Sequence, residues 1–298
     1  MKIEIPEQNG VKESVGSDET ALNKEGDPVA DLFFNLGIDI EKINPLILRK
    51  LRLLNQETNT FKDEKMAIFI ARALFNYYAE NIPNKKFTDQ EERTILVGTL
   101  FTDIGKTGPR NATPEQEKII LDIYNVENIF KPEETTLLQF INKHFPDDAE
   151  TRLVTIETIE KVARNMTMRE FYNLLPEWTL KIISGDGVPL EAVAAAATHH
   201  MLEGINPEEI VGKDGRFTRY FGDNVSFSRD DKLIIILDKY DAGRRRGKLT
   251  HIQAIELIRN KIKGNEQFAE DEEFEELLNN LDAMISANEK VYPSPFEQ

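Results

Sequence analysis

The sequence predicts an all-α fold, and three observations lead to that prediction. Apolar residues recur with the helical period over long stretches, most clearly over residues 62–82. Two capping boxes, which begin at Thr88 and Thr250, mark helix starts. The apolar run at residues 233–242 would also fit a buried strand, but no second strand candidate exists to pair with it, so we expect a helix there.

Proline and glycine bound the first two helices that we expect. Residues 29–36 follow Pro28 and stop before Gly37, and residues 43–54 carry Pro45 in their first turn. The helices expected after them, from their apolar spacing and start signals, cover residues 62–82, 88–101, 132–144, 153–162, 168–175, 189–200, 233–242, 250–263 and 272–287. Four consecutive alanines at residues 194–197 favour a helix that lets a neighbouring backbone approach closely.

We expect one large helical domain at residues 29–263 between two polar ends. Residues 1–28 hold seven acidic residues against three lysines without a sustained period, which is typical of a disordered or loosely attached tail. Residues 264–298 hold ten acidic residues against Lys290 alone, and we expect an acidic C-terminal helix and tail there. Most of the net charge of −16 therefore lies in the two ends.

Composition excludes several classes of protein. The chain has no cysteine, which rules out disulfides and thiolate metal sites. No apolar run approaches the roughly 20 residues of a membrane helix, and the N-terminus lacks the apolar segment of a signal peptide. The nearly neutral middle of the chain has no general attraction for duplex nucleic acid or an anionic membrane. We therefore expect a cytoplasmic protein.

Polar residues at the ends of apolar helical runs form the candidate site. Of the four histidines, His144, His199 and His200 end such runs. Asp103 and Asp238 also lie at the ends of apolar runs. Neutral imidazoles and carboxylates suit a divalent transition metal, and helical bundles build metal sites from facing helices. These residues therefore predict a metal site at one end of a bundle.

Each of these residues also has a simpler interpretation when it is taken alone. Asp103 could pair with Lys106, three residues later in the chain. His144 could cap a helix end, where the helix dipole stabilises a positive imidazole. His199 and His200 could be one core and one surface histidine. The joint order of the residues along the chain favours a shared site.

That order resembles the HD-domain phosphohydrolase superfamily, and most closely its HD-GYP branch. Residues 102–108, Thr-Asp-Ile-Gly-Lys-Thr-Gly, look like the branch's His-Asp-Ile-Gly-Lys-Ile-Gly. Asn-Lys-His at 142–144 is similar to a helix end that carries a ligand histidine, and Ala-Thr-His-His at 197–200 looks like the His-His pair. Asp-Lys-Tyr-Asp-Ala at 238–242 is similar to Asp-Val-Tyr-Asp-Ala. The resemblance covers roughly residues 60–262.

The sequence also departs from the family pattern. Thr102 stands in place of the defining histidine, and the family's first ligand histidine has no counterpart near residues 62–66. The Gly-Tyr-Pro signature after the His-His pair is absent. Residues 110–131 and 145–190 are longer than the family pattern leads us to expect. The resemblance therefore implies one metal site rather than two.

The resemblance implies a divalent transition metal, such as Fe, Mn, Ni or Zn, that polarises a phosphoryl oxygen and activates a bound water. The implied metal ligands are Asp103, His144, His199, His200 and Asp238. The implied catalytic residues are Asp103 and Lys106. The implied phosphate-binding residues are Lys106, Lys239 and Arg244, since lysine offers a point charge and arginine a bidentate contact.

Three functions follow as hypotheses. The first is a metal-dependent phosphohydrolase with an altered site, acting on the phosphodiester or phosphomonoester of a nucleotide or cyclic dinucleotide. The second is an inactive HD-GYP-like relative that binds a nucleotide or a protein partner in signalling. The third is an all-α interaction protein that contacts its partner through the acidic end at residues 264–298.

Overall fold

The computed structural model describes residues 27–126, 130–185, 187–206, 209–214, 216–217 and 227–287. These residues are predominantly helical and form no sheet, which confirms the all-α prediction. None of the described helices is both long and apolar enough to cross a membrane. Except for Asp27 and Pro28, the tail predicted at residues 1–28 lies outside the described residues.

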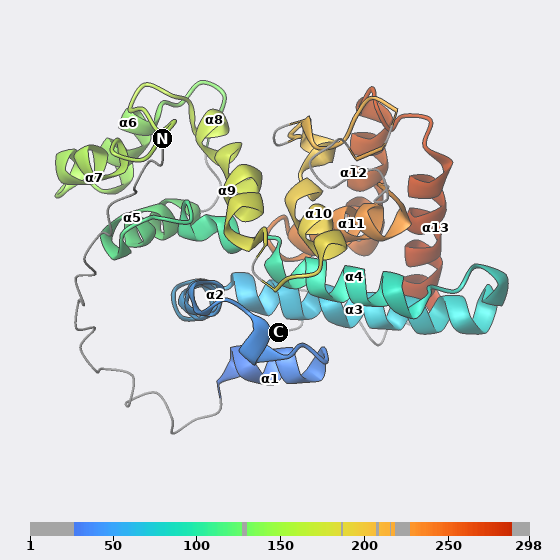
Figure 1. Cartoon of the computed structure of the whole chain (residues 1–298). Coiled ribbons are helices and arrows are strands. Elements are labelled where there is room, and N and C mark those ends of the chain that lie inside the picture. The colour runs from blue at the N-terminus through green and yellow to red at the C-terminus, as the bar shows by residue number, and fades with distance from the viewer. Residues whose placement is uncertain are drawn as a thin grey trace, which may run out of the picture.

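The helices follow one another along the chain with short 3-10 turns between some of them (Figure 1). The elements used below are α1 (Pro28–Asn35), α2 (Pro45–Glu57), α3 (Thr60–Asn81), α4 (Asp89–Phe101), η3 (Ile104–Thr107), α5 (Pro114–Tyr124), α6 (Leu137–His144), α7 (Ala149–Ile156), α8 (Met168–Tyr172), α9 (Leu174–Ile183), α10 (Leu190–Thr198), η4 (Met201–Glu203), α11 (Arg229–Arg245), α12 (His251–Gly264) and α13 (Glu272–Ala287).

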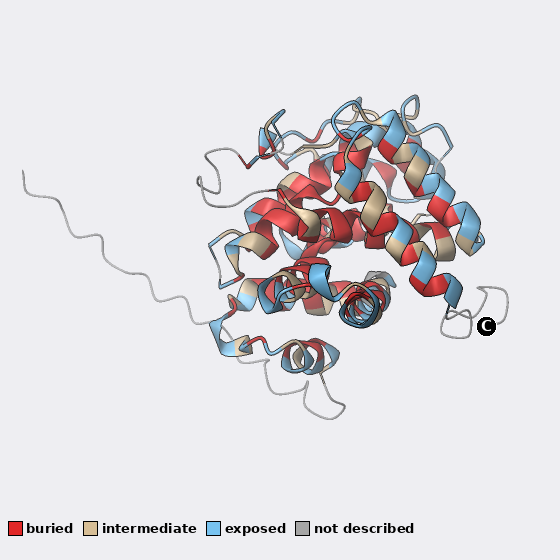
Figure 2. Cartoon of the chain, turned by 90° about the vertical axis from the view of Figure 1, so that its right-hand side faces the viewer, coloured by how far each residue is buried: buried red, intermediate tan, exposed pale blue. Residues whose placement is uncertain are grey.

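Small residues allow α4, α10 and α11 to pack closely at the centre of the molecule. All five alanines of α10, four of them consecutive, are fully buried. A Cβ added to Gly98 of α4 would lie 2.6 Å from Cδ1 of Ile234 on α11 and 3.1 Å from Cβ of Ala195 on α10. The main body of the protein, made of α1–α4 and α10–α13, buries its apolar faces around this contact (Figure 2).

A small lobe with its own core lies beside the main body (Figure 1). It consists of α5–α8 and the first part of α9, and the rest of α9 enters the main core. The sequence does not predict α5 or the separate helix α9, although residues 110–131 and 145–190 are longer than the family pattern leads us to expect. The buried residues at the centre of the small lobe include Ile120, Phe140, Leu153, Phe171 and Trp178.

Helix boundaries in the small lobe differ from the prediction. The helix expected from residue 132 begins only at Leu137, because the side chain of Thr136 accepts from the backbone N–H of Gln139 and caps it there. The helix expected over residues 153–162 is α7, which lies earlier and ends at Ile156. The capping boxes at Thr88 and Thr250 are both present as predicted.

The acidic helix α13 is part of the main body. Its residues Phe274 and Leu278 are fully buried, and Lys232 of α11 forms ion pairs with Asp271 and Glu273 at 2.8 Å. The expected boundary between residues 263 and 264 does not separate two packing units. Removing residues 264–298 would therefore expose core surface, so a deletion is a poor test of a partner contact at this end.

We predict that Ala195→Leu lowers the free energy of unfolding by about 1–3 kcal/mol, because the added methylenes would enlarge a side chain held against Gly98. Denaturant unfolding measures the change. Ala283→Leu, at an exposed position of α13, is the control and should change the free energy by less than about 0.5 kcal/mol. Equal effects of the two substitutions would contradict the close contact of α4 and α10.

Candidate functional site

The chain around Asp103 is held in place by buried contacts to α9. Asp103 follows the end of α4 and precedes η3. The Oγ1 hydroxyl of Thr179 donates to the carbonyl of Thr102 at 3.1 Å and accepts from the N–H of Gly105 at 3.2 Å. A Cβ at position 105 would lie 2.4 Å from the carbonyl oxygen of Leu175, so this close approach requires glycine. These contacts fix the backbone on both sides of Asp103 and therefore the direction of its side chain.

A buried ion pair holds the chain that follows η3. Nζ of Lys50 on α2 is 2.7 Å from Oε1 of Glu117 on α5, and both side chains are almost completely buried. The same ammonium donates to the carbonyls of Thr107 and Pro109 at 3.3 and 3.2 Å. Because an unpartnered buried charge is costly, these contacts tie α2, α5 and the segment after Asp103 to one another.

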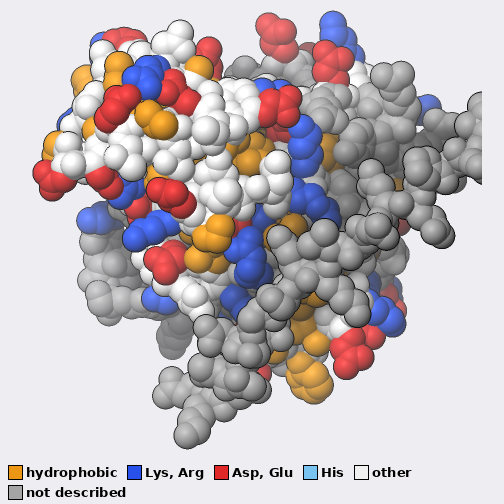
Figure 3. All heavy atoms as spheres, turned by 60° about the vertical axis from the view of Figure 1, so that its left-hand side comes forward, with side chains coloured by type: hydrophobic (Ala, Val, Ile, Leu, Met, Phe, Trp, Pro, Cys, Tyr) orange, Lys and Arg blue, Asp and Glu red, His pale blue; other side chains and the backbone are white. Residues whose placement is uncertain are grey.

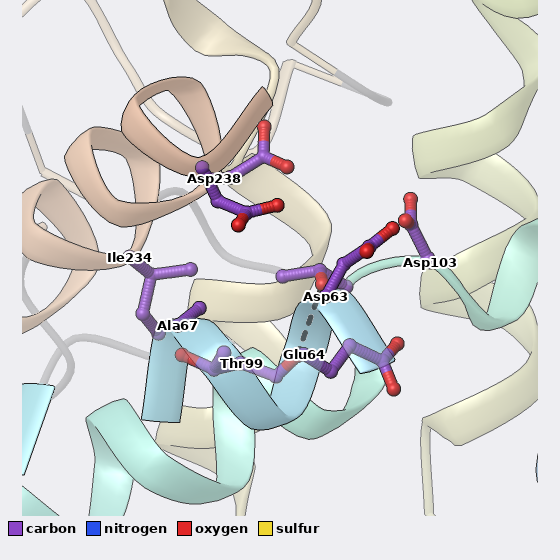
Figure 4. Close-up of a pocket in the computed structure, with 9 residues that line it drawn as sticks. Asp63, Glu64, Ala67, Thr99, Asp103, Ile234 and Asp238 are labelled. Atoms are coloured by element: carbon purple, nitrogen blue, oxygen red, sulfur yellow. Dashed lines mark hydrogen bonds between the residues drawn. The ribbon is translucent and has the colours of Figure 1, made fainter. Parts of the chain in front are cut away.

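Five carboxylates surround a small hollow between α3, α4 and α11 (Figure 4). Its volume is about 20 Å³, which is room for one water or ion. Ala67, Thr99, Thr102 and Ile234 complete its lining. The five acidic residues of this carboxylate hollow are Asp63, Glu64, Asp103, Asp238 and Asp241.

Asp63 and Glu64 are the residues that sequence reasoning missed. Glu64 is 3% exposed and neither of its carboxylate oxygens has a hydrogen-bond partner, while Oδ1 of Asp63 is also buried and unpartnered. Burial raises the pKa of Glu64 well above its usual value and raises that of Asp63 to about 7. The sequence does contain a sign that Glu64 is buried, because this residue shares the helical spacing of the apolar residues Ala67, Ile68 and Ala71.

His199 carries an imidazole nitrogen suited to a cation. Its side chain is fully buried, and Nδ1 lies 2.6 Å from the carbonyl oxygen of Ala196. Because Nδ1 must carry the proton to donate there, Nε2 is left as a lone pair, and it has no partner. Burial, together with the charge of His200, lowers the pKa of His199 to about 3, so the ring stays neutral. This is the usual state of a metal-binding histidine.

Lysines neutralise the two predicted aspartates. Nζ of Lys106 is 2.6 Å from Oδ2 of Asp103, and Nζ of Lys239 is 2.7 Å from Oδ2 of Asp238. Burial opposes ionisation of both carboxyls, but the lysine charges hold their pKa values below the usual range. Lys239 also lies 3.2 Å from Nδ1 of His200, whose ring centroid is 4.0 Å from that of His199. Asp103, His199, His200 and Asp238 therefore share one environment with both lysines.

The structure does not bring His144 or Arg244 to this group. His144 ends α6 in the small lobe, where its exposed ring stacks on Phe140 with centroids 4.6 Å apart. Arg244 donates to the carbonyl of Leu249 at 3.2 Å. The next two residues, Arg245 and Arg246, line the site in its place. The prediction fails for these two residues because neither a position at a helix end nor a place in an arginine run determines the direction in which a side chain points.

A large cleft opens from the carboxylates between the main body and the small lobe. Its volume is about 930 Å³, which is within the size range of small-molecule sites. Its lining holds seven basic residues against five acidic ones, in a chain whose net charge is −16. Figure 3 shows Lys and Arg side chains gathered in a band on the face it draws. The basic residues of the cleft are Lys62, Lys106, Arg169, Lys239, Arg245, Arg246 and Lys261.

Compared with protein-family models, with curated proteins and with solved structures, the chain matches none. The site must therefore be judged by its own chemistry.

The donor set fits a divalent cation, although the side chains are not gathered as a finished coordination shell. Within the described ranges, no three His, Asp or Glu side chains form a group that could hold a metal ion as they lie. Nε2 of His199 and both carboxylate oxygens of Glu64 are nevertheless buried and lack a hydrogen-bond partner in the protein, so their lone pairs could bind a cation. Imidazole and carboxylate together suit Mn²⁺ or a similar metal.

We predict that Thr102→His raises the affinity for Mn²⁺ or its binding stoichiometry. Thr102 is 5% exposed, lines the carboxylate hollow and donates its hydroxyl to the carbonyl of Thr99, so an imidazole at this position would add a ligand. Metal analysis after dialysis measures the change, with the exposed Thr158→His as control. An unchanged metal content in Thr102→His would contradict the assignment of the hollow.

We predict that Mn²⁺ binds more weakly at pH 6 than at pH 8. The raised pKa values of Asp63 and Glu64 mean that protons compete with a cation for these carboxylates as the pH falls. Titration calorimetry measures the affinity, and its dependence on buffer ionisation enthalpy reports the protons released. Glu64→Gln should reduce both the affinity and the proton release. Binding that is independent of pH would place the cation elsewhere.

Proposed function

We propose that the cleft binds a phosphate ester of the nucleotide class and hydrolyses it with one divalent cation, as members of the HD-domain superfamily do. One observation carries the proposal. Four of the five predicted metal ligands, from three segments far apart in the sequence, come together beside Lys106 and Lys239. Three of them line the cleft, and the fully buried His199 lies with its ring centroid 4.0 Å from that of His200. The four ligands are Asp103, His199, His200 and Asp238.

The roles of the residues follow from their positions. Asp103, Asp238 and His199 would hold the cation, with Glu64 and Asp63 on the α3 side of the hollow. The cation would polarise a phosphoryl oxygen and lower the pKa of a bound water. Lys106 and Lys239 lie where they can bind phosphate oxygens as point charges, and Arg246 is surrounded by carboxylates whose charges raise its pKa against the effect of burial.

A second function is binding of the same ligand without turnover. Two observations favour it. Thr102 supplies a hydroxyl that is engaged with the carbonyl of Thr99, where the family has a histidine. The carboxylates of Asp63, Asp103 and Asp238 are already paired with Arg245, Lys106 and Lys239. A site neutralised by its own cations can bind a phosphate ester without providing a metal-bound nucleophile.

Hydrolysis of a chromogenic phosphodiester with Mn²⁺ separates these two functions. We predict turnover by the wild-type chain and a loss of about 10- to 100-fold in His200→Ala, because this residue helps to arrange Lys239 and the metal ligands. His144→Ala is the matched control, since it removes a histidine outside the cleft and should leave turnover unchanged.

Each outcome is decisive. Absence of turnover in a wild-type sample that binds Mn²⁺ and nucleotide would favour the binding function. Turnover that persists in His200→Ala, or that is lost in His144→Ala, would contradict the proposed site.

A further inference from the structure

The small lobe supplies one wall of the cleft with side chains that no family motif includes. Tyr124 ends α5, and Arg169 and Tyr172 belong to α8. All three line the same cleft as Asp103 and Lys106. A ligand that binds at the lysines and extends through the cleft would therefore reach the small lobe.

The hydroxyl of Tyr124 is a hydrogen-bond donor without a partner. Its oxygen is buried and makes no hydrogen bond. Burial raises the pKa of Tyr124 well above 10, with further contributions from Tyr172 and from the charge of Asp103, so the hydroxyl keeps its proton. Burying a hydroxyl without a hydrogen-bond partner costs folding free energy, so such hydroxyls usually bond to a water or a ligand. An acceptor oxygen on a ligand in the cleft would do so.

Tyr172 provides a flat and well-supported surface beside that hydroxyl. Its ring centroid lies 5.2 Å from that of Tyr124 and 6.1 Å from that of Phe171, which is fully buried. The residue is half-buried, so part of it stays open to the cleft that it lines. Rigid aromatic side chains of this kind are suitable platforms for nucleobases, because every base has a flat face.

We propose that the small lobe selects ligands carrying a planar heteroaromatic base, which stacks on Tyr172 while Tyr124 donates to an oxygen of the sugar phosphate. This inference rests on the proposed phosphate-ester function and adds to it the element that distinguishes nucleotides from other phosphate esters. Arg169, held by Glu133 at 2.9 Å, lies at the same wall and is available for a further contact with the base or its phosphate.

Titration calorimetry with AMP, GMP and ribose 5-phosphate in the presence of Mn²⁺ tests the inference. The three probes share a phosphorylated pentose, and only the nucleotides carry a base. We expect the full chain to bind AMP or GMP about tenfold more tightly than ribose 5-phosphate, as stacking of one base would give. Tyr172→Leu, which keeps an apolar contact with the lobe, should remove this preference and leave ribose 5-phosphate binding unchanged.

Three further variants test the hydrogen bond of Tyr124, the position of the effect and the need for an aromatic ring. Tyr124→Phe preserves the ring and should lower the affinity for all three probes by about fivefold, because only a hydrogen bond is lost. Tyr77→Leu, which changes a half-buried tyrosine of α3 outside the cleft, should change none of them. Thermal unfolding of each variant shows whether the lobe remains folded, and Tyr172→Phe should keep the preference for nucleotides.

The outcomes distinguish the inference from the function on which it rests. If the nucleotides and ribose 5-phosphate bind equally and Tyr172→Leu changes neither, the selective role of the lobe is wrong while the phosphate site stands. If none of the three probes binds to the folded chain, the proposed phosphate-ester function itself fails.

Discussion

The close contact of α4, α10 and α11 is the constraint on which the rest of the site depends. Gly98 and the buried alanines of α10 remove the side chains that would keep these helices apart. Asp103 follows α4, the two histidines follow α10, and Asp238 lies within α11, so these residues meet without any long loop to carry them. Thr179 and Lys50 then fix the chain on either side of η3. Packing of small residues thus determines the chemistry of the cleft.

The charges of the site suggest that cation and phosphate binding depend on each other. Asp103 and Asp238 are buried acids that remain ionised because Lys106 and Lys239 stand beside them. A divalent cation bound by these carboxylates would take over the neutralisation, and both lysines would then be available to an anionic ligand. A phosphate drawn to the lysines would in turn favour the cation. Each ligand would therefore reduce the electrostatic cost of binding the other, which is a form of reciprocal coupling.

The sequence predicts most helices of the main body, because they have an apolar period or a cap, as at Thr88 and Thr250. The exception is α11, which is buried on nearly all sides and follows only from the lack of a second strand candidate. It predicts the small lobe poorly, since its helices are short and their burial depends on a second core. Four metal-ligand candidates lie in one environment, but His144 shows that a histidine at a helix end does not reveal which way that helix faces. Glu64 escapes a prediction from family motifs because those motifs place a histidine in this region, whereas α3 carries a buried carboxylate.

The central claim is that one divalent cation binds in the carboxylate hollow, between Asp103, Asp238 and the acidic residues of α3. Anomalous scattering from crystals of the chain soaked in Mn²⁺ tests it most directly. We expect one strong peak in the carboxylate hollow, within coordination distance of Asp103 and Asp238. A saturated crystal with no peak there, or with its main peak beside His144, would contradict the account.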